Sequence, residues 1–256
     1  MRSPDGHVRS AAADILARLR TRRPRVHCIT NTVAQAFTAN LLLAAGAVPS
    51  MTIAQEEIVG FVTGADALLI NLGTLEGARR SAIGIAVDTA EEKPIPWLLD
   101  PVFIDRSPTR AVFAQALIRL RPDAMRLNYD EFAAFAGAEG TVEALAHFAR
   151  NIGTVVALSG DVDVITDGRR TVRIANGHPW MSKITAMGCA GSAVVAACLA
   201  VESEAWLAAA AGQLIVGIAG EVAAGLAQGP GSLAVAILDV LNNLDRATLL
   251  ARAKVM

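Results

Sequence analysis

Residues 26–46, VHCITNTVAQAFTANLLLAAG, contain the repeating unit that decides the fold. The β-branched and apolar residues 26–30 predict a strand, and the Ala- and Leu-rich residues 33–45 predict a helix that ends at Gly46. The same alternation of short strand and Ala-rich helix continues along most of the chain. Such alternation is typical of a mostly parallel sheet with helices on both faces. We therefore predict an α/β fold.

The other predicted elements follow the same pattern. Apolar or β-branched stretches predict strands at residues 67–72, 95–99, 124–127, 154–158, 162–166 and 171–174. Helical patterns lie at residues 56–63, 81–90, 109–120, 130–136, 142–151, 190–200, 205–227 and 233–244. Asp167-Gly168 predicts a hairpin at a sheet edge. The sequence contains no linker or convincing repeat, so we expect one domain, 1–256.

The composition excludes several classes of protein. Apolar residues make up 53 % of the 256 residues, which is too many for a disordered chain. A formal net charge of −1 lacks the surplus of Lys and Arg that nucleic-acid binding needs. The apolar excess favours a subunit interface. Residues 1–25 carry seven arginines, but Asp5 and Asp14 interrupt them and no apolar core is present, so we expect a solvated basic helix rather than a targeting sequence.

Two uncharged stretches raise the question of a membrane span. Residues 184–201 and 205–220 are 18 and 16 residues long and rich in Ala and Gly. A span needs about 20 strongly apolar residues, so we interpret both as buried helices and expect no membrane contact. The three cysteines, Cys28, Cys189 and Cys198, form no disulfide framework or metal-binding pattern, which favours a reducing, cytoplasmic location.

Polar side chains follow several predicted strands. They are Asn31, Asn71, Asp100, Asn128 and Ser159. Because ligands bind at the carboxyl ends of strands in open α/β sheets, these residues predict a small-molecule site. Asp100 and Glu131, which each follow a strand end, are the candidate ligands of Mg²⁺, which binds proteins through one or two carboxylates.

Residues 185–192, TAMGCAGS, open a long helix with small side chains. Uncovered N–H groups and the helix dipole attract an anion at such a terminus, and Gly188 and Gly191 allow a phosphate to approach closely. We expect Cys189 to lie beside this anion site with a pKa lowered by the helix N-terminus, or else to be a small core residue. Neither the Walker A nor the G-x-G-x-x-G pattern occurs, so a P-loop or Rossmann nucleotide site is not expected.

Ten stretches of the chain, in order, match the pattern of one known family. They are VHCITN (26–31), FTAN (37–40), LAAGAVPSM (43–51), QEE (55–57), ALLINLGTL (67–75), LDPV (99–102), RLNYDE (126–131), SGDVD (159–163), ANGHP (175–179) and KIT (183–185) before Gly188-Cys189. Together they resemble the hydroxyethylthiazole kinase family over nearly the whole chain. The resemblance implies a three-layer α/β/α ribokinase-like fold. It also implies transfer of the ATP γ-phosphate, with Mg²⁺, to the hydroxyethyl group of 4-methyl-5-(2-hydroxyethyl)thiazole in thiamine salvage, in a cytoplasmic homotrimer with active sites between subunits.

The resemblance also implies roles for individual residues. It puts Asn31, Met51 and Ala186 at the thiazole, Arg126 and Ser159 at ATP, Asp100 and Glu131 at magnesium, and Cys189 and Gly188 at the phosphoryl-transfer centre. Related sugar kinases carry an Asp general base at the position of Cys189.

Three stretches depart from the family's pattern. FIDR at residues 103–106 replaces a Gly-Ala-Gly-Ala loop, Leu127 replaces a Gly, and Ala186 replaces a Gly expected to face the thiazole. Each change adds a side chain where the backbone approaches a ligand, and it strains the backbone wherever φ is positive. Two alternatives therefore stay open, which are a kinase for another small alcohol and a catalytically weakened ligand-binding homologue. The matches at residues 29–31 and 37–40 disfavour a related ATP-dependent dehydratase that repairs hydrated nicotinamide nucleotides.

Overall fold

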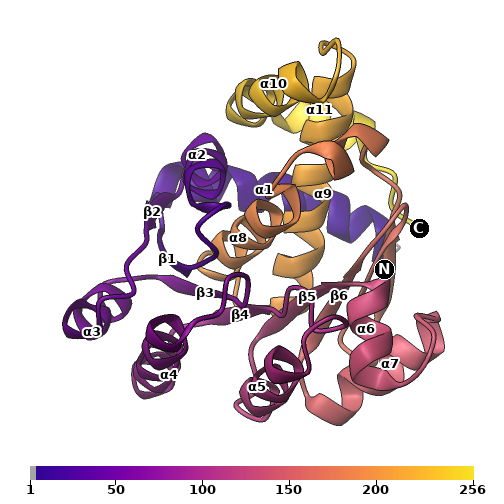
Figure 1. Cartoon of the computed structure of the whole chain (residues 1–256). Coiled ribbons are helices and arrows are strands. Elements are labelled where there is room, and N and C mark those ends of the chain that lie inside the picture. Colours follow the sequence, from indigo (N-terminus) through magenta and orange to yellow (C-terminus); the bar gives the residue numbers. More distant parts are fainter. Residues whose placement is uncertain (1–3) are drawn as a thin grey trace.

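The computed structural model describes residues 4–256, in which eight strands form one sheet (Figure 1). The strand order is β2-β1-β3-β4-β5-β6-β7-β8. The strands are β1 (Arg25–Ile29), β2 (Val48–Ser50), β3 (Ala67–Asn71), β4 (Trp97–Asp100), β5 (Ala124–Asn128), β6 (Val155–Ser159), β7 (Asp163–Thr166) and β8 (Thr171–Ile174). All pairs from β2 to β6 are parallel, and β6–β7 and β7–β8 are antiparallel. The predicted α/β fold with a mostly parallel sheet is confirmed.

Helices cover both faces of the sheet and complete a three-layer architecture (Figure 1). One layer contains α1 (Pro4–Arg22), α2 (Gln35–Ala45), α8 (Met187–Leu199), α9 (Ala205–Ala224), α10 (Pro230–Asn243) and α11 (Arg246–Arg252). The other contains α3 (Gln55–Thr63), α4 (Gly77–Glu92), α5 (Pro108–Ile118), α6 (Tyr129–Ala136) and α7 (Val142–Ile152). Each layer buries its own aliphatic core against the sheet.

The first strand–helix unit forms as predicted, and it leads into a strand that was not predicted. Helix α2 ends at Gly46, whose φ of 97° is left-handed and whose missing side chain leaves room for the backbone of Arg20, 2.9 Å from where a Cβ would lie. The chain then reverses into β2, which is short and contains Pro49. Pro49 lacks an N–H group, and it is tolerated because β2 lies at the edge of the sheet.

The N-terminal helix α1 is not simply solvated, which corrects the expectation from its arginines. Val8, Ile15 and Leu19 are fully buried and belong to the core that contains α9 and α11. Two of its basic residues bind other parts of the fold. Arg18 Nη2 lies 2.6 Å from Glu202 Oε2, and Arg20 Nη2 donates to the carbonyl oxygen of Leu241 at 2.9 Å. The helix is therefore amphipathic and docked.

Helix α9 is long and apolar enough, by length and composition, to cross a membrane. In this fold it packs against α1, α8 and α10, and most of its residues are buried. A central helix of an α/β layer needs this composition, because it has protein on nearly every side. The interpretation of residues 205–220 as a buried helix is confirmed.

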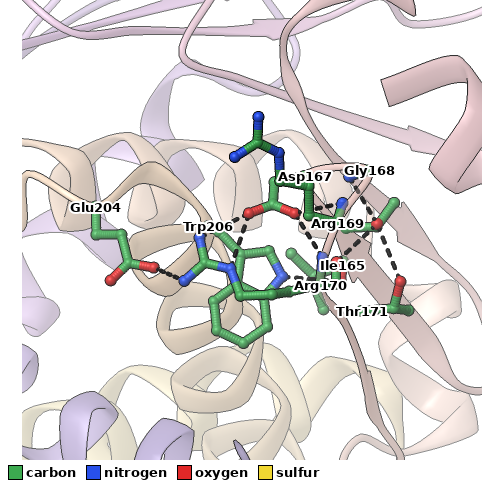
Figure 2. A network of polar contacts seen from close by, with 9 residues as sticks. Ile165, Asp167, Gly168, Arg169, Arg170, Thr171, Glu204 and Trp206 are labelled. Atoms are coloured by element: carbon green, nitrogen blue, oxygen red, sulfur yellow. Dashed lines mark hydrogen bonds and ion pairs between the residues drawn. The ribbon is translucent and has the colours of Figure 1, made fainter. Parts of the chain in front are cut away.

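The predicted hairpin joins β7 to β8 at the sheet edge, and one arginine anchors it to the start of α9 (Figure 2). Arg170 Nη2 lies 2.6 Å from Asp167 Oδ2, and Arg170 Nη1 pairs with Glu204. The guanidinium lies over the ring of Trp206, 4.6 Å from its centroid, and Trp206 Nε1 donates to the carbonyl oxygen of Ile165 at 3.2 Å.

Candidate active site

A cavity of about 1130 Å³ opens at the carboxyl ends of the central strands. Four of the predicted strand-end residues line it, namely Asn31, Asp100, Asn128 and Ser159. Asn71 is fully buried, and it donates from Nδ2 to Asp100 Oδ2 at 2.7 Å. The predicted site is therefore a real cavity, and its volume is at the upper end of the range of small-molecule sites.

The N-terminus of α8 faces this cavity. The helix begins at Met187, three residues before the predicted start, and Ala186 at the N-cap makes no side-chain hydrogen bond to the helix. Gly188 and Cys189 line the cavity, and within residues 4–256 no protein acceptor takes their N–H groups. Because the positive end of the helix dipole adds to these open donors, this terminus can bind an anion.

Cys189 sits in a chain of buried amides. Asn31 Nδ2 donates to Cys189 Sγ at 3.3 Å and to Asn71 Oδ1 at 3.2 Å, and Asn71 in turn binds Asp100. Burial, together with the nearby charge of Asp100, raises the pKa of Cys189 to about 11. The expectation of a lowered pKa is wrong, because desolvation and a neighbouring carboxylate outweigh the helix dipole. The thiol is protonated near neutral pH.

Asp100 lies close enough to Glu131 to influence its ionisation. Asp100 is only 5 % exposed, and its Oδ2 also accepts a hydrogen bond from Ser192 Oγ at 2.8 Å. Burial raises the pKa of Asp100, and burial and the charge of Asp100 both raise the pKa of Glu131. Two neighbouring carboxylates in a buried site store electrostatic repulsion that a bound cation relieves.

Glu131 is held at the start of α6 by its backbone contacts. Asn128 and Glu131 form a reciprocal capping box, in which Glu131 Oε2 accepts from the N–H of Asn128 at 2.9 Å. Glu131 Oε1 accepts from the N–H of Phe103 at 2.8 Å. Within residues 4–256 no group of three His, Cys, Asp or Glu side chains is placed to hold a metal. The pair still suits Mg²⁺, which keeps waters and phosphate oxygens as its remaining ligands.

Arg126 and Ser159 lie on the neighbouring strands β5 and β6. Arg126 donates from Nε to Gln213 Oε1 at 2.8 Å and from Nη1 to the carbonyl oxygen of Gly188 at 3.1 Å. Ser159 Oγ donates to the carbonyl oxygen of Leu127 at 3.3 Å. The guanidinium therefore lies beside the open N-terminus of α8.

The sequence does not predict two of the cavity residues, Asp163 and Gln213. Asp163 begins β7 and accepts the N–H of Gly160 at 3.0 Å, and burial raises its pKa to about 6, although Arg126 opposes this rise. Gln213 lies in α9 and is only 3 % exposed. A signal for Gln213 existed, because it is the one amide side chain among the apolar residues 205–220.

Eight of the nine predicted site residues line the cavity, and Met51 does not. The eight are Asn31, Asp100, Arg126, Glu131, Ser159, Ala186, Gly188 and Cys189. Met51 follows β2 and is half-buried against the core that α2 contributes to. The fold of a single chain therefore does not bring Met51 to the other predicted thiazole contacts.

The departures from the family's pattern differ in their consequences. Ala186 has φ 70° and Phe103 has φ 57°, so the backbone of both residues adopts the left-handed conformation that favours glycine. Leu127 is buried in the core on the α6 and α7 side and has no positive φ. Met187 and Phe103 both line the cavity, and neither fills it, because a volume of about 1130 Å³ remains.

A three-layer α/β/α fold with an open helix N-terminus beside two carboxylates defines a ribokinase-like protein. The model of the hydroxyethylthiazole kinase family matches residues 16–247, and the chain belongs to this family. A probable hydroxyethylthiazole kinase of Agrobacterium fabrum is 41 % identical over 253 residues, covering 99 % of this chain and 98 % of that protein. The hydroxyethylthiazole kinase of Cronobacter sakazakii is 43 % identical, covering 91 % of this chain and 93 % of that protein.

Solved structures share this fold. A hydroxyethylthiazole kinase protein from Pyrococcus horikoshii OT3 superimposes with a TM-score of 0.92 at 36 % identity, covering 96 % of this chain and 98 % of that one. An ADP complex of Bacillus subtilis pyridoxal kinase gives a TM-score of 0.58 at 20 % identity, covering 77 % of this chain and 91 % of that one, and it supports the fold alone.

Proposed function

We propose that this protein transfers the γ-phosphate of ATP to the hydroxyethyl group of 4-methyl-5-(2-hydroxyethyl)thiazole, a step of thiamine salvage. Membership of the hydroxyethylthiazole kinase family supports the reaction class. The observation that carries the proposal is the open N-terminus of α8, flanked in one cavity by Arg126 and by two carboxylates. This combination can stabilise a phosphoryl group in transfer, because that chemistry depends on positioning and on compensation of charge.

The nucleotide would occupy the side of the cavity that Arg126 and Ser159 line. The guanidinium is always charged and can pair with phosphate oxygens in a fork. Asp100 and Glu131 would hold Mg²⁺, which supplies charge neutralisation for the phosphates when it is bound. The N–H groups of Gly188 and Cys189 would receive the oxygens of the migrating group.

The alcohol would lie next to Asn31, Ala186 and Cys189. Because the pKa of Cys189 is raised to about 11, its thiol is a poor general base at neutral pH. A loose transition state needs little early deprotonation of the attacking hydroxyl, so the proton can leave late. We assign Cys189 and Asn31 the role of fixing the hydroxyl beside the α8 N-terminus.

We also propose a cytoplasmic homotrimer with active sites between subunits. The position of Met51 supports it, since this residue contacts thiazole in the proposal yet lies outside the cavity of its own chain. Met51 would then contact the thiazole that is bound in the cavity of a neighbouring subunit. Three free cysteines are consistent with a reducing compartment.

The test is ADP release by the purified protein with ATP, Mg²⁺ and the thiazole alcohol. We expect turnover that depends on all three, and an Asp100→Asn variant should lose about 100-fold or more in kcat because magnesium loses a charged ligand. Asp88→Asn, on the exposed side of α4, serves as the matched control and should keep full activity. Absence of turnover with this alcohol, alongside turnover with another hydroxyethyl heterocycle, would contradict the assigned substrate.

A further inference from the structure

Gln213 is a buried amide in the otherwise apolar stretch 205–220 of helix α9. It lies in α9, is 3 % exposed, and lines the same cavity as Arg126. Its Oε1 accepts the Nε–H of Arg126 at 2.8 Å. Its Nε2 is buried and has no hydrogen-bond partner among residues 4–256. A buried amide with one end bound and one end empty needs an explanation, because the empty donor lowers the stability of the fold.

The orientation of this amide follows from its partner. Arginine carries only donors, so the atom that faces Nε must be the carbonyl oxygen of Gln213. The empty end is therefore the NH₂ group. Rotating the amide would bring two donors together and would leave both residues without the bond, so the arrangement is fixed by Arg126.

Arg126 is thereby held at two points. Gln213 binds Nε from the α9 side, and the carbonyl oxygen of Gly188 binds Nη1 from the first turn of α8. The guanidinium carbon lies 3.8 Å from where a Cβ of Gly191 would be, so the guanidinium packs close to that turn. Among residues 4–256, Nη2 of Arg126 has no hydrogen-bond acceptor. It is therefore available to bind a ligand beside the open N–H groups of α8.

We propose that Gln213 is a positioning residue, which holds the Arg126 guanidinium in the orientation that binds the phosphates of the nucleotide. This inference rests on the proposed function, in which Arg126 contacts ATP. A long arginine side chain loses much rotamer freedom when it binds a ligand, and fixing it beforehand reduces that cost. Gln213 thus lowers the stability of the fold and raises the affinity of the site for the nucleotide.

The experiment compares Gln213→Leu with wild type in two measurements, which are the Kd for ADP by calorimetry and the melting temperature. We expect the Kd to rise about tenfold, because binding of ADP must then order a freely rotating Arg126 side chain. We expect the melting temperature to change little, because the unpartnered donor is removed while the Nε–H of Arg126 loses its acceptor. A lower melting temperature with an unchanged Kd would mean a purely structural role and would overturn the proposal. Gln115→Leu, an exposed glutamine on α5, is the control for the substitution itself.

A second variant and a double-mutant cycle sharpen the result. Gln213→Met keeps the length of the side chain and replaces the leucine variant if that chain fails to fold. In an Arg126→Ala background, the Gln213 substitution should cause no further rise in the Kd for ADP. Independent, additive effects would overturn the proposal, since Gln213 would then not act through Arg126.

Failure of the proposed function and failure of the positioning role give different results. If wild type binds ADP but never phosphorylates the thiazole alcohol, and Gln213→Leu still weakens ADP binding, the proposed substrate is wrong and the positioning role stands. If wild type phosphorylates the alcohol and Gln213→Leu binds ADP normally with an unchanged KM for ATP, the positioning role is wrong and the function stands.

Discussion

The amide nitrogen of Asn31 donates to the sulfur of Cys189 at 3.3 Å, which joins the end of β1 to the first turn of α8. The bond marks Cys189 as an acceptor in a polar chain that ends at Asp100, and the neighbouring carboxylate works against a thiolate. The sulfur is therefore held in place while its proton is retained.

Cys189 should behave as an unreactive thiol. Because burial and Asp100 raise its pKa to about 11, alkylation by iodoacetamide should keep accelerating above pH 9. Cys28 and Cys198 are fully buried, so the folded protein reports on Cys189. A Cys189→Ser variant retains an acceptor for Asn31 and should keep kcat within about threefold of wild type, since no thiolate is lost. An alkylation rate that levels off by pH 8, or a 100-fold loss of kcat in the serine variant, would contradict this assignment.

The fold could be predicted because its signals are local. The strand–helix alternation and the cap at Gly46 are visible in the sequence, and the strand-end residues Asp100 and Ser159 meet in one cavity because parallel strands end at the same edge. The edge strand β2 escaped prediction, since three residues around a proline carry little β signal.

The electrostatics and the long-range contacts could not be predicted in the same way. The pKa of Cys189 depends on burial and on Asp100, which is 89 residues away in sequence and reaches it only in the folded state. The bond between Arg126 and Gln213 likewise joins β5 to α9. The resemblance places Met51 at the thiazole, but a single chain does not bring it to the cavity.

Asp163 should make the protein less stable as the pH rises from about 4 to about 6. Burial raises its pKa to about 6 from the ordinary value near 3.8, so the folded protein holds this proton over a range in which the unfolded chain releases it. The stabilisation is fully present below about pH 4 and is lost as the pH passes through 6, with an upper limit of about 3 kcal/mol. Urea unfolding between pH 4 and 7.5 measures it.

An Asp163→Asn variant should remove this pH dependence. Asparagine keeps an oxygen for the N–H of Gly160 but has no proton to release. We compare the unfolding free energy of the variant with that of wild type at each pH. This difference should be more favourable to the variant at pH 7 than at pH 4. The exposed Asp161→Asn is the matched control and should leave the curve unchanged. Equal slopes for wild type and Asp163→Asn would show that this carboxyl does not titrate in the folded protein within the range.

Arg170 should stabilise the β7–β8 hairpin without affecting the active site. It pairs with Asp167 and Glu204 and lies over Trp206, so Arg170→Ala removes ion pairs and a cation–π contact together (Figure 2). About half of the side chain is exposed, so we expect a loss of only about 1 kcal/mol in unfolding free energy. Arg170→Lys should recover less than half of this loss, because the ammonium does not reproduce the planar fork. Denaturant unfolding is the measurement, with the exposed Arg169→Ala as control, and a change in KM for ATP would contradict the structural role.

Ala186 holds the N-cap of α8 in a conformation that suits glycine. Its φ of 70° brings the Cβ close to the following carbonyl oxygen, at a cost of about 1 kcal/mol. Ala186→Gly should therefore raise the unfolding free energy by about that amount, even though glycine usually lowers it. The control is Ala133→Gly at an exposed position in the middle of helix α6, which should lower it by about 1 kcal/mol. Opposite signs for the two substitutions in one denaturation series are the expected result, and they separate backbone strain from helix propensity. A loss of stability at both positions would mean that Ala186 carries no strain, and the left-handed N-cap would then not explain why the family favours glycine there.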